Sequence, residues 1–340
     1  MNTATTTHAM TLALNAAWDY QLLTFPNPAV GAACISENGS IVSVGAHKIA
    51  GGPHAEVYAL RDAYTLLSGD VSIADSDDSH YIHDYLRTHH NGLFHTVSMA
   101  VTLEPCSHSG KTPSCALLIR DLRIKSLFIS CKDPNPAAAG GAEIVSVSGA
   151  ECVFGIMETE GKKLLEPFLK WQSSPFVFFK WAQRLDGTID NGTISSATSR
   201  THMHALRDKC DLIVIGGNTV RQDKPTLDAR LVNGNAPDVL IYSRDEDFDR
   251  TIPLFNIPNR QVFIASDFEQ IHNYRLVMIE GGAGMLEASS NICDWYLGYI
   301  APKIGGGTQT LGTVTEDFEV LHAKITDNII LWMKKQQELL

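Results

Sequence analysis

The sequence predicts an α/β protein of two domains, and three observations lead to this prediction. The chain has 340 residues, which exceeds the usual size of a single domain. In both halves, short apolar segments that favour strands alternate with segments of helical periodicity. A helical pattern in the middle of the chain ends at Pro175, where a new strand pattern begins. We therefore predict a first domain over 1–150, a linker helix over 151–175 and a second domain over 176–340.

The composition is that of a globular protein with an acidic balance. Hydrophobic residues make up 44% of the chain and charged residues 19%, which is enough to build buried cores. The net charge of −11 argues against a general binder of nucleic acids or membrane surfaces, because both are negatively charged. Residues 1–20 lack the basic start and continuous apolar stretch of a signal peptide, and no apolar run reaches the length of a membrane span. We therefore expect a cytoplasmic protein.

The first half shows a regular succession of elements. We expect helices over 8–20, 53–67 and 113–121, and strands over 30–36, 40–46, 97–103 and 126–131. Asn38-Gly39 lies between the first two strands and is a typical hairpin turn. Because strands and helices alternate, the pattern predicts a largely parallel sheet that is covered by helices.

Residues 69–95 interrupt this succession with a polar stretch rich in Asp and His, which we interpret as an insertion. Its histidines lack acidic or thiol partners at the fixed spacings of metal sites. We therefore expect them to lie on a solvated helix or loop rather than to bind a metal. They are His80, His83, His89 and His90.

The second half repeats the alternation and predicts a second α/β domain. The expected strands are Phe176–Gln183, 211–216, 238–243, 260–265, 275–280 and 295–301, and the expected helices are 197–208 and 283–292. The sequence contains no internal repeat and no low-complexity segment that would point to a different architecture.

Potential metal ligands stand next to the predicted helix starts of the first half. His54 and Glu56 fall in the first turn of a helix that is expected to begin at Pro53. Positions two apart on a helix point in different directions, so these two side chains can share one site only above the helix end. Cys106 follows a strand, and Cys115 lies at the start of another helix, for which Thr112 and Pro113 are the expected cap and first position.

This ligand set fits a catalytic zinc site. A catalytic zinc ion takes three protein ligands and leaves one position for water, and His54, Cys106 and Cys115 supply an imidazole and two thiolates. Thiolates near helix starts are stabilised by the positive end of the helix dipole. Glu56 can take a proton from the water and pass it to a departing amine. Zinc deaminases carry a His-x-Glu motif followed by Pro-Cys-x-x-Cys; here eight residues separate the two cysteines.

A structural zinc site is the alternative interpretation of these residues. Structural zinc ions usually have four protein ligands, and the sequence offers no obvious fourth Cys or His. We therefore favour a catalytic site. The remaining cysteines stand among apolar residues and are expected to be core thiols; they are Cys34, Cys131, Cys152, Cys210 and Cys293.

The loop between the two cysteines carries a more specific resemblance. PCSHSGKTPSC begins at Pro105 and occurs together with His54–Glu56, Pro26–Gly31 and Asp133–Pro136. In this combination the sequence resembles the bifunctional deaminase–reductase family of riboflavin biosynthesis, over nearly the whole chain. The resemblance implies that the first domain has a three-layer fold like that of cytidine deaminase. It assigns the substrate contacts of this domain to Asn27, His47, His108 and Lys111.

Three segments of the second half carry the same resemblance: Ala182–Gly187, Gly216–Arg230 and Glu280–Gly284. Ala301–Gly307 also matches the end of the family pattern. Glycines between a strand and a helix let the backbone approach a phosphate at the helix start, although a tight turn alone is an alternative for so short a motif. The full dinucleotide fingerprint is absent, and the resemblance implies a fold like that of dihydrofolate reductase.

The resemblance also assigns residues of the second domain. Its substrate contacts are expected at Arg207, Leu227, Arg230 and Glu280. Its NADPH contacts are expected at Ala182, Thr219, Asp223, Ser243, Gly282, Ala283 and Gly284. The two arginines are candidates for the substrate phosphate, since guanidinium groups suit bidentate phosphate contacts. The carboxylate at 280 is a candidate contact to a substrate hydroxyl, and Asp223 is expected near the nicotinamide.

The implied enzyme is a zinc-dependent deaminase joined to an NADPH-dependent reductase, which forms a homodimer through its reductase domain. Its substrate would be a small phosphorylated pyrimidine, without nucleic acid or membrane as partners. The alternative is a deaminase whose second domain only binds a ligand or dimerises. Three departures from the family pattern favour this alternative: residues 191–194 lack the usual Ser and Trp, Arg184 replaces a small residue, and the segment between Tyr242 and Glu280 is short. The acidic balance disfavours a nucleic-acid-editing deaminase.

Overall fold

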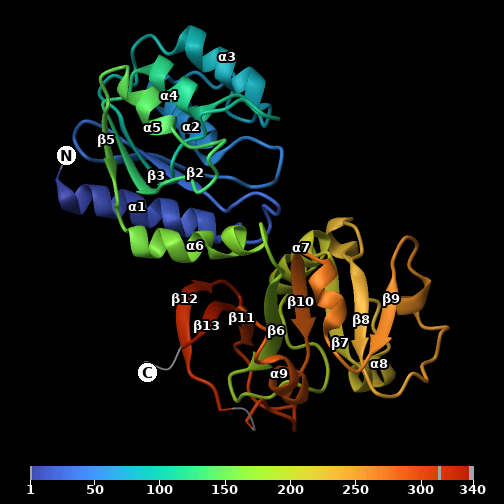
Figure 1. Cartoon of the computed structure of the whole chain (residues 1–340). Coiled ribbons are helices and arrows are strands. Elements are labelled where there is room, and N and C mark those ends of the chain that lie inside the picture. Colours follow the sequence, from blue (N-terminus) through green and yellow to red (C-terminus); the bar gives the residue numbers. More distant parts are fainter. Residues whose placement is uncertain (1, 313–314, 337–340) are drawn as a thin grey trace. The chain divides into compact units, whose positions relative to one another are not determined.

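A computed structural model describes residues 2–312 and 315–336, and the chain divides into two compact units. The first unit is Met1–Leu169 and the second is Lys170–Leu340. Each unit contains one sheet with helices packed on it (Figure 1). Among the described residues, no helix combines the length and the apolar character needed to cross a membrane.

The first unit contains a five-stranded mixed sheet in the order β2-β1-β3-β4-β5. Its strands are β1 (Gly31–Ile35), β2 (Ile41–Ala46), β3 (Ser98–Leu103), β4 (Ser126–Cys131) and β5 (Glu151–Phe154). β1 is antiparallel to both β2 and β3, whereas β3, β4 and β5 are parallel to one another. The prediction of a largely parallel sheet therefore holds only for β3, β4 and β5. The antiparallel pairing of β1 with β2 agrees with the hairpin expected at Asn38-Gly39, whereas the antiparallel pairing of β1 with β3 was not predicted. The short turn after β1 returns the chain directly beside it, which makes the pair antiparallel.

Six helices accompany this sheet. They are α1 (Thr3–Trp18), α2 (Ala55–Ser68), α3 (Ser79–His89), α4 (Cys115–Leu122), α5 (Gly141–Ser146) and α6 (Glu158–Lys170). Helices α2 and α4 each begin two residues later than predicted. His54 is the N-cap residue of α2, and Ser114 caps α4 by accepting a hydrogen bond from the backbone N–H of Leu117. Both prolines therefore precede the caps instead of opening the helices.

The stretch 69–95, interpreted above as a polar insertion, contributes apolar side chains to the core of the first unit, while His80 and His89 are exposed as expected. Ile73, Leu86 and Phe94 are fully buried in the main apolar cluster of the unit. The apolar face of α3 packs against α2 and α4. His83 lies on this buried face, and within the described part of the chain neither of its ring nitrogens has a hydrogen-bond partner. The surface position expected for this histidine is thus corrected.

The interval 151–175 holds a strand as well as a helix. β5 extends the first sheet by pairing with β4, and α6 follows it. Leu164 and Leu165 of α6 are buried, and the Gln21 side chain donates a hydrogen bond of 2.8 Å to the carbonyl of Leu164. Helix α6 is thus packed onto the first unit rather than standing apart as a linker.

The second unit contains an eight-stranded sheet in the order β12-β13-β11-β6-β10-β7-β8-β9. Its strands are β6 (Phe176–Arg184), β7 (Leu212–Gly216), β8 (Asp238–Tyr242), β9 (Val262–Ala265), β10 (Leu276–Glu280), β11 (Trp295–Ala301), β12 (Phe318–Ile325) and β13 (Ile329–Lys335). All six predicted strands are present and run parallel. The hairpin β12–β13 was not predicted; it adds two antiparallel strands at one edge.

Three helices lie between the parallel strands of this unit: α7 (Ala197–Lys209), α8 (Gly217–Asp223) and α9 (Ala283–Ser289). Large aromatic side chains fill the centre of the unit, and Phe176, Phe179, Trp295 and Tyr296 are fully buried. In a parallel sheet, loops at the carboxyl ends of neighbouring strands meet at one edge. β6, β10, β7 and β8 are such neighbours, and they bring the predicted reductase segments to the same edge.

Candidate active sites

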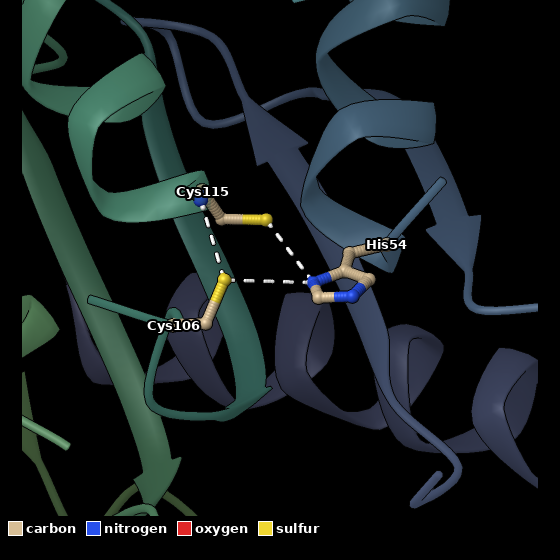
Figure 2. A group of neighbouring side chains, drawn as sticks. All are labelled: His54, Cys106 and Cys115. Carbon is tan, nitrogen blue, oxygen red and sulfur yellow. Dashed lines mark hydrogen bonds between the residues drawn. The ribbon is translucent and has the colours of Figure 1, made fainter. Parts of the chain in front are cut away.

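The three predicted metal ligands converge in the first unit. His54 caps α2, Cys106 follows β3, and Cys115 is the first residue of α4. One ligand atom from each of the three residues lies within 4.8 Å of the others. His54 Nδ1 is 3.6 Å from the sulfur of Cys106 and 3.4 Å from that of Cys115 (Figure 2). Segments about fifty residues apart in the sequence thus supply one nitrogen and two sulfurs to a single point.

Short-range hydrogen bonds hold this arrangement. The carbonyl of Cys106 accepts from the Ser114 hydroxyl at 2.8 Å, and the backbone N–H of Cys115 donates to the Cys106 sulfur at 3.4 Å. On the other side of the imidazole, Thr112 Oγ1 lies 3.3 Å from His54 Nε2. The ring is therefore held at Nε2, and its Nδ1 faces the two sulfurs.

The protonation of this cluster suits a cation. The hydrogen bond from Cys115 lowers the pKa of the Cys106 thiol to about 4, and the same bond, together with burial, raises the pKa of Cys115. Burial by itself lowers the pKa of His54, but the hydrogen bond to Cys106 and the nearby negative charges raise it. The site thus favours positive charge, and its one nitrogen and two sulfurs are the donors that zinc prefers. The residues fit a zinc ion.

Glu56 lies in the first turn of α2 and is almost completely buried. Burial raises the pKa of its carboxyl group to about 7. A group with such a pKa can both accept and donate a proton near neutral pH, as a general acid–base catalyst must. Glu56 lines the same cavity as His54 and Cys106, as its predicted role requires.

The cavity at this cluster has a volume of about 460 Å³ and is lined by all four predicted substrate contacts of the first domain. Asn27 and His47 lie inside it, joined by a 3.1 Å contact between the amide nitrogen of Asn27 and Nε2 of His47. His47 Nδ1 is 3.0 Å from the carbonyl of Pro53, and burial lowers the pKa of this histidine to about 4. His47 is therefore neutral at pH 7. His108 and Lys111 are exposed on the loop that forms part of the cavity wall.

Sequence reasoning missed Glu104, which also lines this cavity. Its buried carboxylate accepts hydrogen bonds from the backbone N–H groups of Asp133, Gly140 and Ala142 at 3.2 to 3.3 Å. It thereby holds the loop that carries Asp133 and Asn135 into the cavity. The available signal was an acidic residue directly after an apolar strand, a position that rarely tolerates a charge without partners.

In the second unit, Arg207 and Glu280 contact each other. Arg207 donates to both carboxylate oxygens of Glu280, at 2.9 Å from Nε and 3.1 Å from Nη2. Lys180, which sequence reasoning missed, lies 3.5 Å from the same carboxylate. Burial alone raises the pKa of Glu280, but the two cations outweigh it and lower the pKa to about 2. The signal for Lys180 was a lysine inside an otherwise apolar central strand.

The other predicted reductase residues lie on several strand ends. Leu227 is buried, whereas Arg230 is exposed and pairs with the Asp228 carboxylate at 2.7 Å. Arg207 Nη1 reaches the carbonyl of Asp228 at 3.3 Å, which links this loop to Glu280. The predicted cofactor contacts come from β6, α8, the end of β8 and the start of α9; they are Ala182, Thr219, Asp223, Ser243, Gly282, Ala283 and Gly284.

Both halves of the chain match known families. Residues 3–131 match the cytidine and deoxycytidylate deaminase zinc-binding region, and residues 175–328 match the RibD C-terminal domain. The riboflavin biosynthesis protein RibD of Corynebacterium ammoniagenes is 32% identical over 321 residues, which cover 88% of this chain and 86% of the relative. The RibD protein of Aquifex aeolicus is 29% identical over 379 residues, which cover 96% and 97% of the two chains.

A solved structure extends this similarity along the chain. The diaminohydroxyphosphoribosylaminopyrimidine deaminase/5-amino-6-(5-phosphoribosylamino)uracil reductase of Thermotoga maritima is 27% identical and has a TM-score of 0.66. The match covers 98% of this chain and 99% of the other. Together, these similarities confirm the predicted fold class, an α/β chain with a cytidine-deaminase-type first domain and a reductase-type second domain.

Proposed function

The chain belongs to the family of bifunctional riboflavin biosynthesis proteins RibD, which join a deaminase and a reductase, and we propose that it converts one substrate in two successive steps. The first step hydrolyses the exocyclic amine of 2,5-diamino-6-ribosylamino-4(3H)-pyrimidinone 5′-phosphate. The second reduces the ribose of the product to a ribityl chain with NADPH. The names of the Thermotoga maritima relative's two activities support this assignment, and the RibD C-terminal match favours it over a deaminase with an inactive second domain.

The observation that carries the proposal is the cavity that combines His54, Cys106 and Glu56. His54, Cys106 and Cys115 would hold zinc, which supplies Lewis acidity that makes water a nucleophile near neutral pH. Glu56 borders the same space with a pKa of about 7. Its carboxylate takes a proton from the attacking water and returns it to the leaving amine, so that ammonia departs as a neutral molecule.

The remaining side chains of the cavity orient the pyrimidine. His47 is neutral and is held by the Pro53 carbonyl, so it presents a fixed hydrogen-bonding edge together with Asn27. Lys111 and His108 lie on the exposed loop of the cavity wall, where they can meet the 5′-phosphate without the cost of burying an unpaired charge. The base and the phosphate are thus bound by different elements.

In the second unit, we assign the substrate hydroxyl contact to Glu280. Its carboxylate stays ionised because Arg207 and Lys180 surround it, and an ionised carboxylate accepts hydrogen bonds from a sugar. Arg207 then acts through Glu280, and the exposed Arg230 is the better candidate for the phosphate. NADPH would lie along the strand ends that carry Thr219 and Gly282, and it supplies the hydride. Dimerisation through this domain and a cytoplasmic location stay predictions.

A coupled assay tests the proposal. Purified protein with zinc, the diaminopyrimidine phosphate and NADPH should release ammonia first and then consume NADPH. Release of ammonia without loss of NADPH absorbance would refute the reductase step. As a control, the Glu56→Gln variant should fail with the diamino substrate but still oxidise NADPH when given the substrate already deaminated.

A further inference from the structure

Arg184 is the last residue of β6, and its side chain is buried although the chain turns toward the surface at this point. Its guanidinium group binds the loop that follows. Nη1 donates to Thr188 Oγ1 at 3.1 Å and to the carbonyl of Asp190 at 2.9 Å, and Nη2 donates to the carbonyl of Asn191 at 2.7 Å. One side chain thus fixes the 185–191 loop at three acceptors.

The 185–191 loop is in turn bound to a second loop, 303–309, which follows β11. The Asp190 carboxylate accepts from the backbone N–H of Thr308 at 2.7 Å and from that of Gln309 at 3.0 Å. The Ile189 N–H donates to the Gln309 carbonyl at 2.9 Å. Segments more than one hundred residues apart in the sequence are therefore joined by several hydrogen bonds, most of them to backbone groups.

The glycines of the 303–309 loop make this close approach possible. Gly305 and Gly306 have φ values of 79° and 91°, which side chains rarely adopt. A Cβ atom at Gly307 would lie 2.5 Å from Asp190 Oδ1 and 2.9 Å from Arg184 Nη1. The three glycines therefore allow the unusual backbone conformation of this loop and leave room for the Arg184 and Asp190 side chains.

The joined loops lie beside the Glu280–Gly282 turn. A Cβ atom at Gly282 would come within 2.9 Å of Ile189 Cδ1, so the 185–191 loop packs directly against this glycine. β6 and β10 are adjacent parallel strands, which brings the loops after them to the same edge of the sheet. Gly282 caps α9, at the position predicted for cofactor contact.

We propose that Arg184 is a positioning residue of the reductase, which with Asp190 locks the two loops into a rigid wall beside the NADPH site. The inference rests on the proposed function, since it takes NADPH as the cofactor of this half. A loop that is already ordered loses little conformational entropy when the cofactor binds, so the lock increases affinity without touching the reacting atoms. Lysine could not replace arginine here, because its single nitrogen cannot occupy the positions of both Nη1 and Nη2, from which the three acceptors are reached.

The test compares Arg184→Ala with two other variants of the full-length protein. Arg184→Ala should raise the KM for NADPH about tenfold, with kcat changed by less than about twofold, because only loop ordering is lost. Hydrogen exchange at the Thr308 and Gln309 amides should accelerate, while the deaminase rate stays unchanged. Arg184→Lys should show the same rise in the KM for NADPH and the same faster exchange as Arg184→Ala. The control is Arg250→Ala, which removes an exposed charge of the same unit and should alter none of these quantities.

Asp190→Ala separates the lock from a general loss of folding, because it removes the hydrogen bonds of the Asp190 carboxylate to Thr308 and Gln309 without emptying a buried site. It should reproduce the higher KM and the faster exchange. Wild-type KM values in both variants, or an equal fall in kcat and kcat/KM, would overturn the proposal. If the wild-type chain binds no NADPH, the proposed reductase function fails and the positioning role fails with it. Faster exchange combined with unchanged NADPH binding would refute the positioning role of Arg184 but leave the proposed reductase function intact.

Discussion

The two halves of the chain each place a largely buried carboxylate in a candidate site, and the two carboxylates have opposite pKa shifts. Glu56 of the first unit has its pKa raised to about 7, mainly by burial. Burial acts on Glu280 of the second unit in the same direction, but Arg207 and Lys180 lower its pKa to about 2. A glutamate can thus exchange a proton near neutral pH in the first unit, whereas a glutamate stays ionised at that pH in the second.

The difference follows from the chemistry that each half performs. Deamination moves protons between water and an amine, and in the first unit the effect of burial on Glu56 outweighs the opposing charge of His54. Reduction takes its hydride from a cofactor, so the second unit needs carboxylates and arginines that hold the substrate still. The comparison predicts that perturbations of the two sites should be separable, and the following experiments test this from the largest effect to the smallest.

Removal of zinc should have the largest effect and should act on one half only. Dialysis against a strong chelator should reduce ammonia release by more than about a thousandfold, because the water would no longer be activated. NADPH oxidation with the deaminated substrate should be unchanged. Both rates are measured on the same preparation, and re-addition of zinc serves as the control. Loss of both activities would show that the two halves are not independent.

Glu56→Gln should lower the deaminase rate by ~10²- to 10⁴-fold, the usual contribution of a general acid–base group. The amide has nearly the same size but cannot carry the proton. Zinc content, measured by elemental analysis, should remain at the wild-type level, since Glu56 is not among the three clustered ligands. A variant that keeps its deaminase rate would contradict the role assigned to Glu56.

The ionised state of Glu280 should appear in the pH dependence of stability. Because its folded pKa is lowered from 4.5 to about 2, its stabilising effect is complete above 4.5 and is lost as pH falls toward 2. The loss is worth about 3 kcal/mol in the free energy of unfolding. Tryptophan fluorescence suits the urea titrations, since four of the five tryptophans lie in the second half: Trp171, Trp181, Trp295 and Trp332.

The matched variant for this measurement is Glu280→Gln. It should be less stable than wild type at pH 7, because Arg207 and Lys180 lose their anion, and it should lose less stability on acidification. Parallel curves for the two proteins between pH 5 and pH 2 would argue against the lowered pKa. Deamination at pH 7 should be equal in both proteins.

Thr112→Val should have the smallest effect. Its hydroxyl lies 3.3 Å from His54 Nε2, on the side of the ring away from the sulfurs. Removing such a partner typically weakens metal binding ~10-fold, because the imidazole is no longer held in one orientation and tautomer. Zinc affinity measured by chelator competition should fall in Thr112→Val and be largely restored in Thr112→Ser. Equal affinities in all three proteins would exclude this orienting role.

Local sequence patterns were sufficient to predict those strands and metal ligands that are determined by residues close to them in the sequence. The alternation of apolar segments predicted the six parallel strands of the second unit, because periodicity is a local property. His54, Cys106 and Cys115 were predicted from donor type and from their positions next to helix starts. Helix starts are encoded by prolines and caps, although the caps themselves proved to be His54 and Ser114.

The tertiary structure decided what depends on contacts between distant segments. The burial of His83, the contact of Lys180 and Arg207 with Glu280, and the antiparallel pairing of β1 with β3 were not predicted. Burial and charge pairing set the pKa of a group, and both depend on which strands and helices become neighbours. The sequence by itself therefore determined the kinds of chemistry present, whereas folding determined which side chains are charged and which of them meet.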